Sequence, residues 1–340
     1  MIVTRSLRFI GVLFTLHCSC AYAQLAVPFY KGKMIEIIVG FPPGAYNDVY
    51  SRLLASHIGK HIPGGPTFVI RNMPGAGSFL AVNHIYKNAP KDGTTIGLGS
   101  PTIALDEVLE TEGVRFKAQE LGWIGRTNSN INILATWKSS PVKTIEQAKL
   151  SEVTLSGTGV GSTTSIYPVV MNNVVGTRFK MVMGYKGSNE GMLAMERGET
   201  EGHSTSWTTF YGMHPTWFSD GSVSVLVQFA LARNPQLKDV PAAPELAGSP
   251  EQKAILEAVL SATEIGYAFF TTPDTPAGRL ETLRDAFNNT VRDPDFLAEA
   301  AKMTAEIQAL SGEKLEQLVR NLGALPPMIK DKIKLALVQK

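Results

Sequence analysis

The stretch Gly40–Asp48, which reads G-F-P-P-G-A-Y-N-D, must turn an apolar strand predicted at Met34–Val39 sharply into a helix predicted at Val49–His61. Its two glycines can adopt backbone angles that other residues avoid, and its two prolines stiffen the turn. We expect Asn47 or Asp48 to cap the helix. A helix N-terminus presents unpaired N–H groups and about half a positive charge, so this turn can hold a carboxylate without Lys or Arg. The alternative is an ordinary corner between a strand and a helix.

The same succession of strand, Gly-rich turn and helix is repeated in the first third of the chain. Thr67–Arg71 is a second predicted strand, and the turn Asn72–Gly77 leads from it into a helix predicted at Ser78–Lys87. Thr94–Gly99 is a third predicted strand, which ends at Ser100. Strands that alternate with helices predict a parallel sheet, and its Gly-rich loops then lie beyond the carboxyl ends of the strands, where ligands bind.

A second α/β unit is predicted after the polar segment Thr127–Asn130, with a third Gly-rich turn at Gly157–Thr163. Its strands and helices are predicted at Asn132–Trp137, Val153–Ser156, Thr164–Val175, Lys180–Gly184, Asn189–Arg197, Glu201–Thr205 and Val223–Phe229. Gly266–Thr271 is typical of a buried strand that returns to the first sheet. We therefore expect two hinge-linked lobes around one cleft, with residues 24–129 and 251–340 in lobe 1 and residues 130–250 in lobe 2.

Residues 1–23 are typical of an export signal and are not part of the predicted fold. Arg5 and Arg8 precede the apolar run Phe9–Leu16, and Ala21–Ala23 forms an A-x-A site, so we expect cleavage after Ala23. The apolar run is well short of the ~20 residues that cross a bilayer. The sequence therefore predicts a soluble, exported protein in the periplasm.

Composition limits the chemistry of the mature chain. The two cysteines, Cys18 and Cys20, lie within the signal, which excludes disulfides, thiolate catalysis and Cys-bound metal from the mature protein. Without the two arginines of the signal, 30 basic residues balance 30 acidic ones. This balance argues against nucleic acid or an acidic membrane surface as the main partner. The remaining ~317 residues are enough for two domains.

Enzyme and metal sites find little support in the sequence. No G-x-G-x-x-G or G-x-x-x-x-G-K-[ST] phosphate loop occurs, and no G-x-S-x-G motif, although a Ser/His/Asp set assembled from distant positions stays open. His57 and His61 have a spacing that suits zinc but lack a third ligand, so we expect solvated helix residues. His203 can hydrogen-bond a ligand, but a paired strand histidine is the simpler interpretation.

A group of aromatic residues follows the last predicted strand before Val223. We expect these side chains to fill the core of the second lobe, and only the first of them, directly after a strand end, is a candidate for the pocket. They are Trp207, Tyr211, Trp217 and Phe218.

Six motifs occur in a fixed order along the chain: F-P-P-G at Phe41–Gly44 followed by Asp48, N-x-P-G-A-G at Asn72–Gly77, D-G-x-x-x-x-x-G-S at Asp92–Ser100, G-x-G-x-x-x at Gly157–Ser162, G-Y-K-G-S at Gly184–Ser188, and P-x-T-P at Pro273–Pro276. This combination resembles the Bug family, the extracytoplasmic solute receptors of tripartite tricarboxylate transporters. The resemblance runs from about Met34 to Pro276. It implies a type II, Venus-flytrap periplasmic binding protein that captures a di- or tricarboxylate or an aromatic acid and delivers it to the permease subunits in the membrane.

The resemblance also implies where the ligand lies. One carboxylate would rest on first-lobe loops, at Phe41, Gly44, Ala45, Tyr46, Asn47, Ala76, Gly77, Ser78 and Ser100. The second lobe would close over it with Gly157, Thr158, Gly161, Ser162, Thr163, Tyr185, Gly187, Ser188, Ser206 and Trp207. The resemblance implies no catalytic residue, cofactor or metal, so we expect the protein to bind its ligand and release it unchanged. We also expect a monomer.

The chain departs from the family pattern at Ala45-Tyr46-Asn47, where members usually have a second glycine after F-P-P-G. Tyr46 adds an aromatic ring at the edge of the cleft and can stack on the ligand or shorten the pocket, so the identity of the carboxylate stays open. A rival function is a periplasmic sensor component that presents the same ligand to a signalling receptor. A hydrolytic enzyme is a more distant rival. A neighbouring gene for a permease would favour transport, and one for a histidine kinase would favour sensing.

Overall fold

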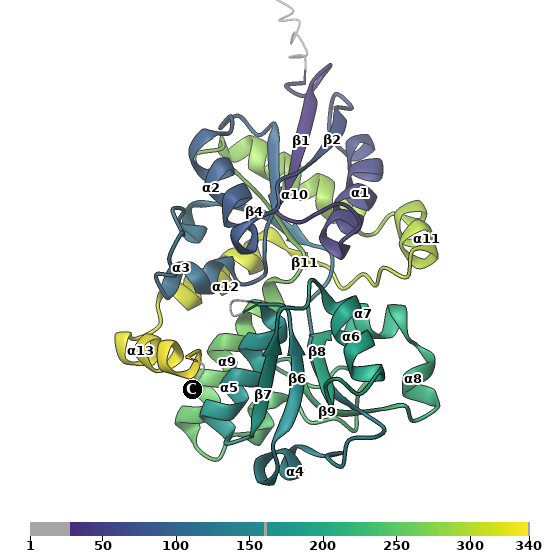
Figure 1. The fold of residues 1–340 in the computed structure, drawn as a ribbon. Helices are drawn as coiled ribbons and strands as arrows, with labels where there is room; N and C mark the ends of the chain where they lie inside the picture. The colour runs from purple at the N-terminus through teal and green to yellow at the C-terminus, as the bar shows by residue number, and fades with distance from the viewer. Residues whose placement is uncertain (1–27, 160–161, 339–340) are drawn as a thin grey trace, which may run out of the picture.

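The computed structural model describes residues 28–159 and 162–338 of the 340-residue chain. Its strands form two mixed sheets, each covered by helices, and the two α/β lobes lie one above the other in Figure 1. The predicted architecture of two α/β lobes is therefore confirmed. The export signal predicted at residues 1–23 lies outside the described residues. In the part of the chain that the structure describes, no helix is both long enough and apolar enough to cross a membrane.

The first sheet contains six strands in the order β11-β4-β10-β3-β1-β2. They are β1 (Met34–Val39), β2 (Thr67–Asn72), β3 (Thr95–Leu98), β4 (Gly122–Arg126), β10 (Ala268–Thr271) and β11 (Leu310–Ser311). β1 pairs in parallel with both β2 and β3, as the alternation of strands and helices predicts. Consequently the loops that follow these three strands meet at one edge. β10 returns to this sheet, as expected, and pairs antiparallel with β3 and β4.

The second sheet contains five strands in the order β7-β6-β8-β5-β9. They are β5 (Asn132–Trp137), β6 (Val153–Gly157), β7 (Phe179–Met183), β8 (Gly202–Ser206) and β9 (Val223–Phe229). β6 pairs in parallel with β7 and β8, whereas β5 pairs antiparallel with β8 and β9. The carboxyl ends of β6, β7 and β8 therefore lie at one edge, and the Gly-rich turns after β6 and β7 share that edge with the start of α7.

The helices cover both sheets. In the first lobe they are α1 (Tyr46–Ile58), α2 (Phe79–Asn88), α3 (Ile103–Val108), α10 (Ala277–Thr290), α11 (Pro294–Lys302) and α12 (Gly312–Gly323). In the second lobe they are α4 (Ile145–Leu150), α5 (Thr163–Val175), α6 (Ser188–Glu196), α7 (Trp207–Met213) and α8 (Thr216–Ser219). Two more helices, α9 (Pro250–Ile265) and α13 (Pro327–Ala336), both pack against α5, and Figure 1 shows them beside the second lobe.

Two crossings between the lobes lie side by side. The amide of Tyr267 donates to the carbonyl of Asn128 at 3.0 Å, and the amide of Asn130 donates to the carbonyl of Thr263 at 3.0 Å. The first crossing thus falls in the polar segment where it was predicted. The division at residues 129/130 and 250/251 stays a prediction, because α9 contacts helices of both sheets and α13 packs against α5.

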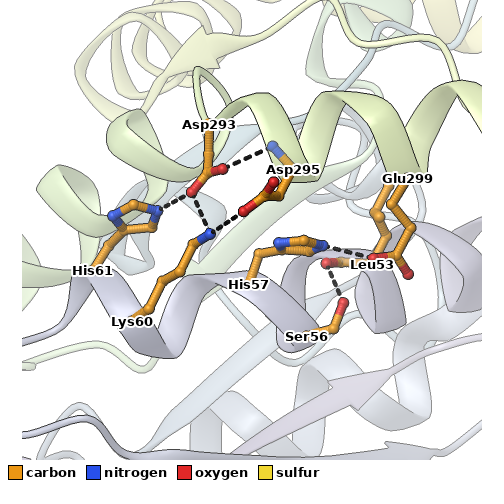
Figure 2. A network of polar contacts seen from close by, with 8 residues as sticks. All are labelled: Leu53, Ser56, His57, Lys60, His61, Asp293, Asp295 and Glu299. Carbon is orange, nitrogen blue, oxygen red and sulfur yellow. Dashed lines mark hydrogen bonds and ion pairs between the residues drawn. The ribbon is translucent and has the colours of Figure 1, made fainter.

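Figure 2 shows a polar network that fastens α1 and the 3-10 turn after it to α11. His57 Nε2 lies 2.7 Å from Glu299 Oε2, and His61 Nε2 lies 2.9 Å from Asp293 Oδ2. Lys60 Nζ lies 2.6 Å from the same Asp293 oxygen. The expectation that the two histidines are solvated is wrong, since both side chains are mostly buried and each faces a carboxylate. Among the described residues, no cluster of His, Cys, Asp and Glu is arranged to hold a metal ion.

Candidate functional site

The loop after β1 is shaped by Gly44 and Asp48. Gly44 has a φ of 84°, in the left-handed region that glycine tolerates best. The expected cap of α1 by Asn47 or Asp48 is wrong, because Ala45 occupies the N-cap position and no side chain caps the helix. Asp48, in the first turn of the helix, instead points back and accepts a hydrogen bond from the Gly44 amide at 2.9 Å. A carboxylate near a helix N-terminus is stabilised there, and this one also closes the loop.

Asp48 also ties the first loop to the second. Its carboxylate accepts hydrogen bonds from Arg52 Nε and from Asn72 Nδ2, both at 2.9 Å, and Asn72 Nδ2 also donates to the Phe41 carbonyl. Burial opposes ionisation of Asp48, but the hydrogen bonds from Arg52, Gly44 and Asn72 together outweigh it and lower the pKa of the carboxyl group. Asp48 is therefore an anion that fixes the loops rather than one that faces a ligand.

The turn after β2 has an unusual backbone. Four consecutive residues, Gly75 to Ser78, have positive φ angles, including 46° at Ala76 and 79° at Ser78. Such angles are uncommon for residues with a Cβ atom and concentrate at functional sites. Buried Ser78 holds the turn by accepting a hydrogen bond from the amide of Ser100 at 2.8 Å, after β3. The three first-lobe loops are thus packed against one another.

The second lobe contributes the loop before α5. Ser162 is the N-cap residue of this 13-residue helix, and its Oγ lies 2.8 Å from the Gly159 carbonyl and 2.6 Å from Thr164 Oγ1. Thr164 Oγ1 accepts a hydrogen bond from the Thr158 amide at 3.1 Å. These contacts fasten Thr158 and Gly159 to the start of α5, whose first amides have no acceptor within the helix. The predicted site residue Gly161 lies outside the described residues.

The end of β8 supplies hydroxyl groups to the same region. Ser206 caps α7, since its Oγ accepts from the Thr209 amide at 3.1 Å, and Thr205 Oγ1 lies 2.7 Å from Ser188 Oγ at the start of α6. His203, earlier in the strand, is fully buried with Nδ1 2.8 Å from Ser156 Oγ, which confirms a paired strand histidine. Burial lowers its pKa to about 4, so its ring is neutral near pH 7.

A cavity of about 260 Å³ lies between the lobes at these loops. Its first-lobe wall is formed by residues of the β1, β2 and β3 loops and of α1, and its second-lobe wall by the starts of β5, α5 and α7. The lining residues are Phe41, Tyr46, Asn47, Gly77, Ser100, Pro101, Asn130, Asn132, Ser162, Thr163, Thr205, Ser206, Thr209 and Tyr267. None of these described residues has a charged side chain. The cavity therefore offers hydroxyls, amides and the N-termini of two helices to a ligand.

The structure brings eight of the predicted site residues together in this cavity: Phe41, Tyr46, Asn47, Gly77, Ser100, Ser162, Thr163 and Ser206. Ala76 and Thr158 line a neighbouring cavity of about 330 Å³ that shares Gly77, Ser100 and Ser162 with the first. Gly44, Ala45, Ser78, Gly157, Tyr185, Gly187 and Ser188 are not part of either lining. Several of these residues instead shape or fasten the loops, as Gly44, Ser78 and Ser188 do.

The aromatic group after β8 divides between core and surface. Trp207 and Trp217 are buried in the core of the second lobe, with Phe218 packed against it, as predicted. Tyr211 is 45% exposed, so its assignment to the core is wrong. Trp207 donates its Nε1 hydrogen to Gln236 Oε1 at 2.7 Å and lines a separate cavity, not the one between the loops.

Three residues at the floor of the cavity were not predicted from the sequence. Asn130 and Tyr267 lie in the two crossings, and Asn132 begins β5. Asn132 Nδ2 donates to the Asn130 carbonyl at 3.0 Å, while the side-chain oxygens of both asparagines are buried without a hydrogen-bond partner among the described residues. Leaving such an acceptor unpaired costs about 1–3 kcal/mol, so these oxygens suit a ligand that donates a hydrogen bond. The Asn-x-Asn pattern between two apolar strands was the available signal.

Comparison with known proteins gives a consistent result. The sequence profile described as "Tripartite tricarboxylate transporter family receptor" matches residues 51–333. A TctC solute-binding protein from Polaromonas superposes with a TM-score of 0.67 at 20% identity, over 90% of this chain and 99% of that one. The periplasmic binding protein BugD gives a TM-score of 0.65 at 19% identity, over 92% of this chain and 100% of its own.

Rpa4515 of R. palustris, whose structure contains adipate, gives a TM-score of 0.64 at 22% identity, over 90% of this chain and 97% of that one. At these identities the superpositions show a shared fold. The match of the family profile extends over most of the chain, from within α1 to α13, and includes the second sheet and most of the loops that line the cavity. Strand β1 and the loop that carries Phe41, Tyr46 and Asn47 precede it.

Proposed function

Because the chain belongs to the tripartite tricarboxylate transporter receptor family, we propose that it captures a small carboxylate in the cavity between its two lobes and delivers it to the permease subunits of such a transporter. Members of this family are solute-binding receptors and not enzymes, and they belong to the periplasmic binding proteins. The proposal therefore concerns the ligand, its position and its destination.

The observation that carries the proposal is a polar cavity without a charged side chain among its described lining residues. Tyr46 and Asn47 begin α1 on one wall, and Ser162 and Thr163 begin α5 on the other. Each helix end contributes unpaired amides and part of the helix dipole, so two N-termini from opposite lobes favour an anion between them. An anion held by amides rather than by Lys or Arg is bound without a buried ion pair.

The residues proposed to contact the ligand are those that the cavity brings together: Phe41, Tyr46, Asn47, Gly77, Ser100, Ser162, Thr163 and Ser206. Asn132 joins them, because its buried side-chain oxygen can accept a hydrogen bond from a hydroxyl group of the ligand. Sites for drug-sized ligands are about 300–1,000 Å³, so a cavity of about 260 Å³ suits a small acid. The presence of adipate in the R. palustris relative is in keeping with this ligand class.

The proposal includes export. Residues 1–23 would be removed after Ala23, and the mature protein would act in the periplasm as a Cys-free monomer. N-terminal sequencing of the exported protein should begin at Gln24. A mature chain that starts before Ala21, or one with a lipid at its N-terminus, would contradict this part.

Ligand binding is tested by calorimetry on the purified mature protein after unfolding and refolding to remove any retained ligand. Succinate, L-malate and adipate should each be compared with its neutral diamide. We expect the acids to bind and the diamides to fail, because only the acids carry the charge that two helix N-termini attract. Binding of the diamides with equal affinity, or no binding of any carboxylate in a broad panel, would overturn the proposal. The acid should be recovered chemically unchanged after binding, as expected of a receptor that does not convert its ligand.

A further inference from the structure

A second and larger cavity lies beside the polar one. It measures about 620 Å³, lies between α7 of the second lobe and α11 of the first, and is lined mainly by apolar groups. Helices α7 and α11 lie on the same side of the molecule in Figure 1. Trp207 and Tyr211 contribute from α7, Leu297 and Ala300 from α11, and Ile307 from the segment that follows α11. This cavity would hold a hydrocarbon chain or an aromatic ring better than a charged group.

Tyr46 connects the wall of the polar cavity to the wall of the apolar one. It lines the polar cavity, and its hydroxyl group lies beside Gly212, which lines the apolar one. A Cβ atom at Gly212 would lie 2.6 Å from Tyr46 Oη, which shows how closely the two lobes approach here. Tyr46 therefore forms a partition that begins on α1 and ends on α7.

Two more tyrosines fix this partition. The ring centres of Tyr46 and Tyr50 lie 6.4 Å apart, and those of Tyr50 and Tyr267 lie 4.5 Å apart. Tyr50 Oη donates to the Glu306 carbonyl at 2.8 Å, and Glu306 lines the apolar cavity, whereas Tyr267 lines the polar one. The row Tyr46-Tyr50-Tyr267 thus connects the linings of the two cavities, and Tyr50 is held in it by the hydrogen bond to Glu306 and by tilted ring contacts with its two neighbours.

We propose that Tyr46 limits the length of the ligand, because its ring closes the polar cavity toward the apolar one. The inference rests on the proposed function, since it assumes that a carboxylate occupies the polar cavity. Short acids then fit completely, while an acid with a longer hydrocarbon chain meets the tyrosine ring. Without that ring, the chain of the acid can enter the apolar cavity, and each buried methylene should strengthen binding about fourfold, which corresponds to about 0.8 kcal/mol per CH₂.

The test is a chain-length series measured by calorimetry. Straight-chain monocarboxylates from butyrate to decanoate are titrated into wild type, Tyr46→Phe and Tyr46→Ala, with succinate and adipate as references for the polar cavity. In wild type and Tyr46→Phe, affinity should stop rising once the chain reaches the ring. In Tyr46→Ala it should continue to rise by about fourfold per added methylene. Parallel length profiles in wild type and Tyr46→Ala would overturn the inference.

The same experiment separates this inference from the proposed function. If wild type binds succinate or adipate and the two length profiles are parallel, only the role of Tyr46 is wrong. If no carboxylate binds wild type, the proposed function fails and the role of Tyr46 with it. Tyr46→Ala should leave the fold intact, because Ala is a good helix former and Tyr46 lies at the start of α1.

A second pair of variants tests the partition without removing the ring. Gly212→Ala places a methyl group 2.6 Å from Tyr46 Oη and should weaken succinate binding by at least about fivefold, because it obstructs contact between the lobes. Adding Tyr46→Phe removes the oxygen, and the next atom, Cζ, is 3.8 Å from the added methyl group. The double variant should therefore bind like Tyr46→Phe alone. Unchanged affinity in Gly212→Ala, or no recovery in the double variant, would contradict the contact.

Discussion

The buried ring of His203 should make the stability of the protein fall as the solution is acidified. The ring belongs to the second residue of β8 and lies against α6, where Gly191 leaves room for it: a Cβ atom at Gly191 would lie 2.6 Å from His203 Cε1. Nδ1 contacts Ser156, while Nε2 is buried without a hydrogen-bond partner among the described residues. Protonation would create a buried cation with an unpaired donor, which explains a pKa lowered to about 4 by burial.

The sign and size of the effect follow from linkage. An unfolded histidine has a pKa of 6.5, so between pH 6.5 and about 4 the unfolded chain binds a proton that the folded chain does not. The free energy of unfolding therefore contains a contribution that is present above pH 6.5 and is lost progressively as the pH falls to about 4. A difference of ~2.5 pKa units corresponds to ~3 kcal/mol, a large part of the 5–15 kcal/mol that is typical of a folded protein.

The measurement is urea unfolding of wild type and His203→Asn at several pH values from 7.5 to 4.5, followed by circular dichroism. The variant removes the ring but keeps an amide that can donate to Ser156. It should be less stable than wild type at pH 7.5, and the difference should shrink on acidification, because only wild type loses the contribution of the neutral ring. Burial raises the pKa values of Asp106 and Glu107, which has the opposite sign, but this effect is common to both proteins and cancels. Equal pH dependence in the two proteins would refute the argument.

Two further substitutions test the loops. Ser162→Asp places a negative charge at the start of α5, where the fold tolerates it as an N-cap but where it faces the proposed anion. Calorimetry should show that succinate binds about 5- to 150-fold more weakly, which corresponds to a loss of about 1–3 kcal/mol of binding free energy. The melting temperature should stay near that of wild type. Unchanged affinity would mean that this loop is not part of the site. Asp48→Asn should lower the free energy of unfolding by about 1.5–3 kcal/mol, because a neutral amide replaces a carboxylate that accepts from Gly44, Arg52 and Asn72. Urea unfolding near pH 7 measures this loss, and wild-type stability in the variant would mean that the loops do not depend on the charge.

Much of the fold could be predicted because its strands are buried on both faces. Ile35, Ile37, Ile38 and Val39 are all fully buried in β1, so the strand is visible as a nearly continuous apolar run that only Glu36 interrupts. For the same reason β5 and β9 were predicted at their observed bounds, and β10 was correctly expected to return to the first sheet. Gly-rich turns at the ends of such strands then located the edge of each sheet at which the cavity lies.

The periodicity of apolar residues could not predict contacts between segments that are far apart in the sequence. Asp48 was expected to cap its own helix, but Gly44 and Asn72 offered it better partners across the loops. Likewise, the two histidines of Figure 2 were interpreted as solvated because nothing in α1 shows that Asp293 and Glu299 lie opposite them. Asn130 was recognised only as a crossing, since its place in the cavity depends on the angle between the lobes.

The floor of the cavity is also the joint between the lobes. Asn130 and Tyr267 line the cavity and belong to the two crossings that are hydrogen-bonded to each other. A third connection runs from α12, which packs against β4, to α13, which packs against α5, and Asn173 Nδ2 donates to the carbonyls of Ala336 and Val338 at 2.9 Å. A rotation of the lobes about the first two crossings would separate the walls of the cavity but not its floor. A ligand that touches both walls therefore binds more tightly to the closed arrangement, and its measured affinity includes the free energy of closure. It follows that a substitution at Asn173, which is not part of the cavity lining, can change affinity by altering closure alone.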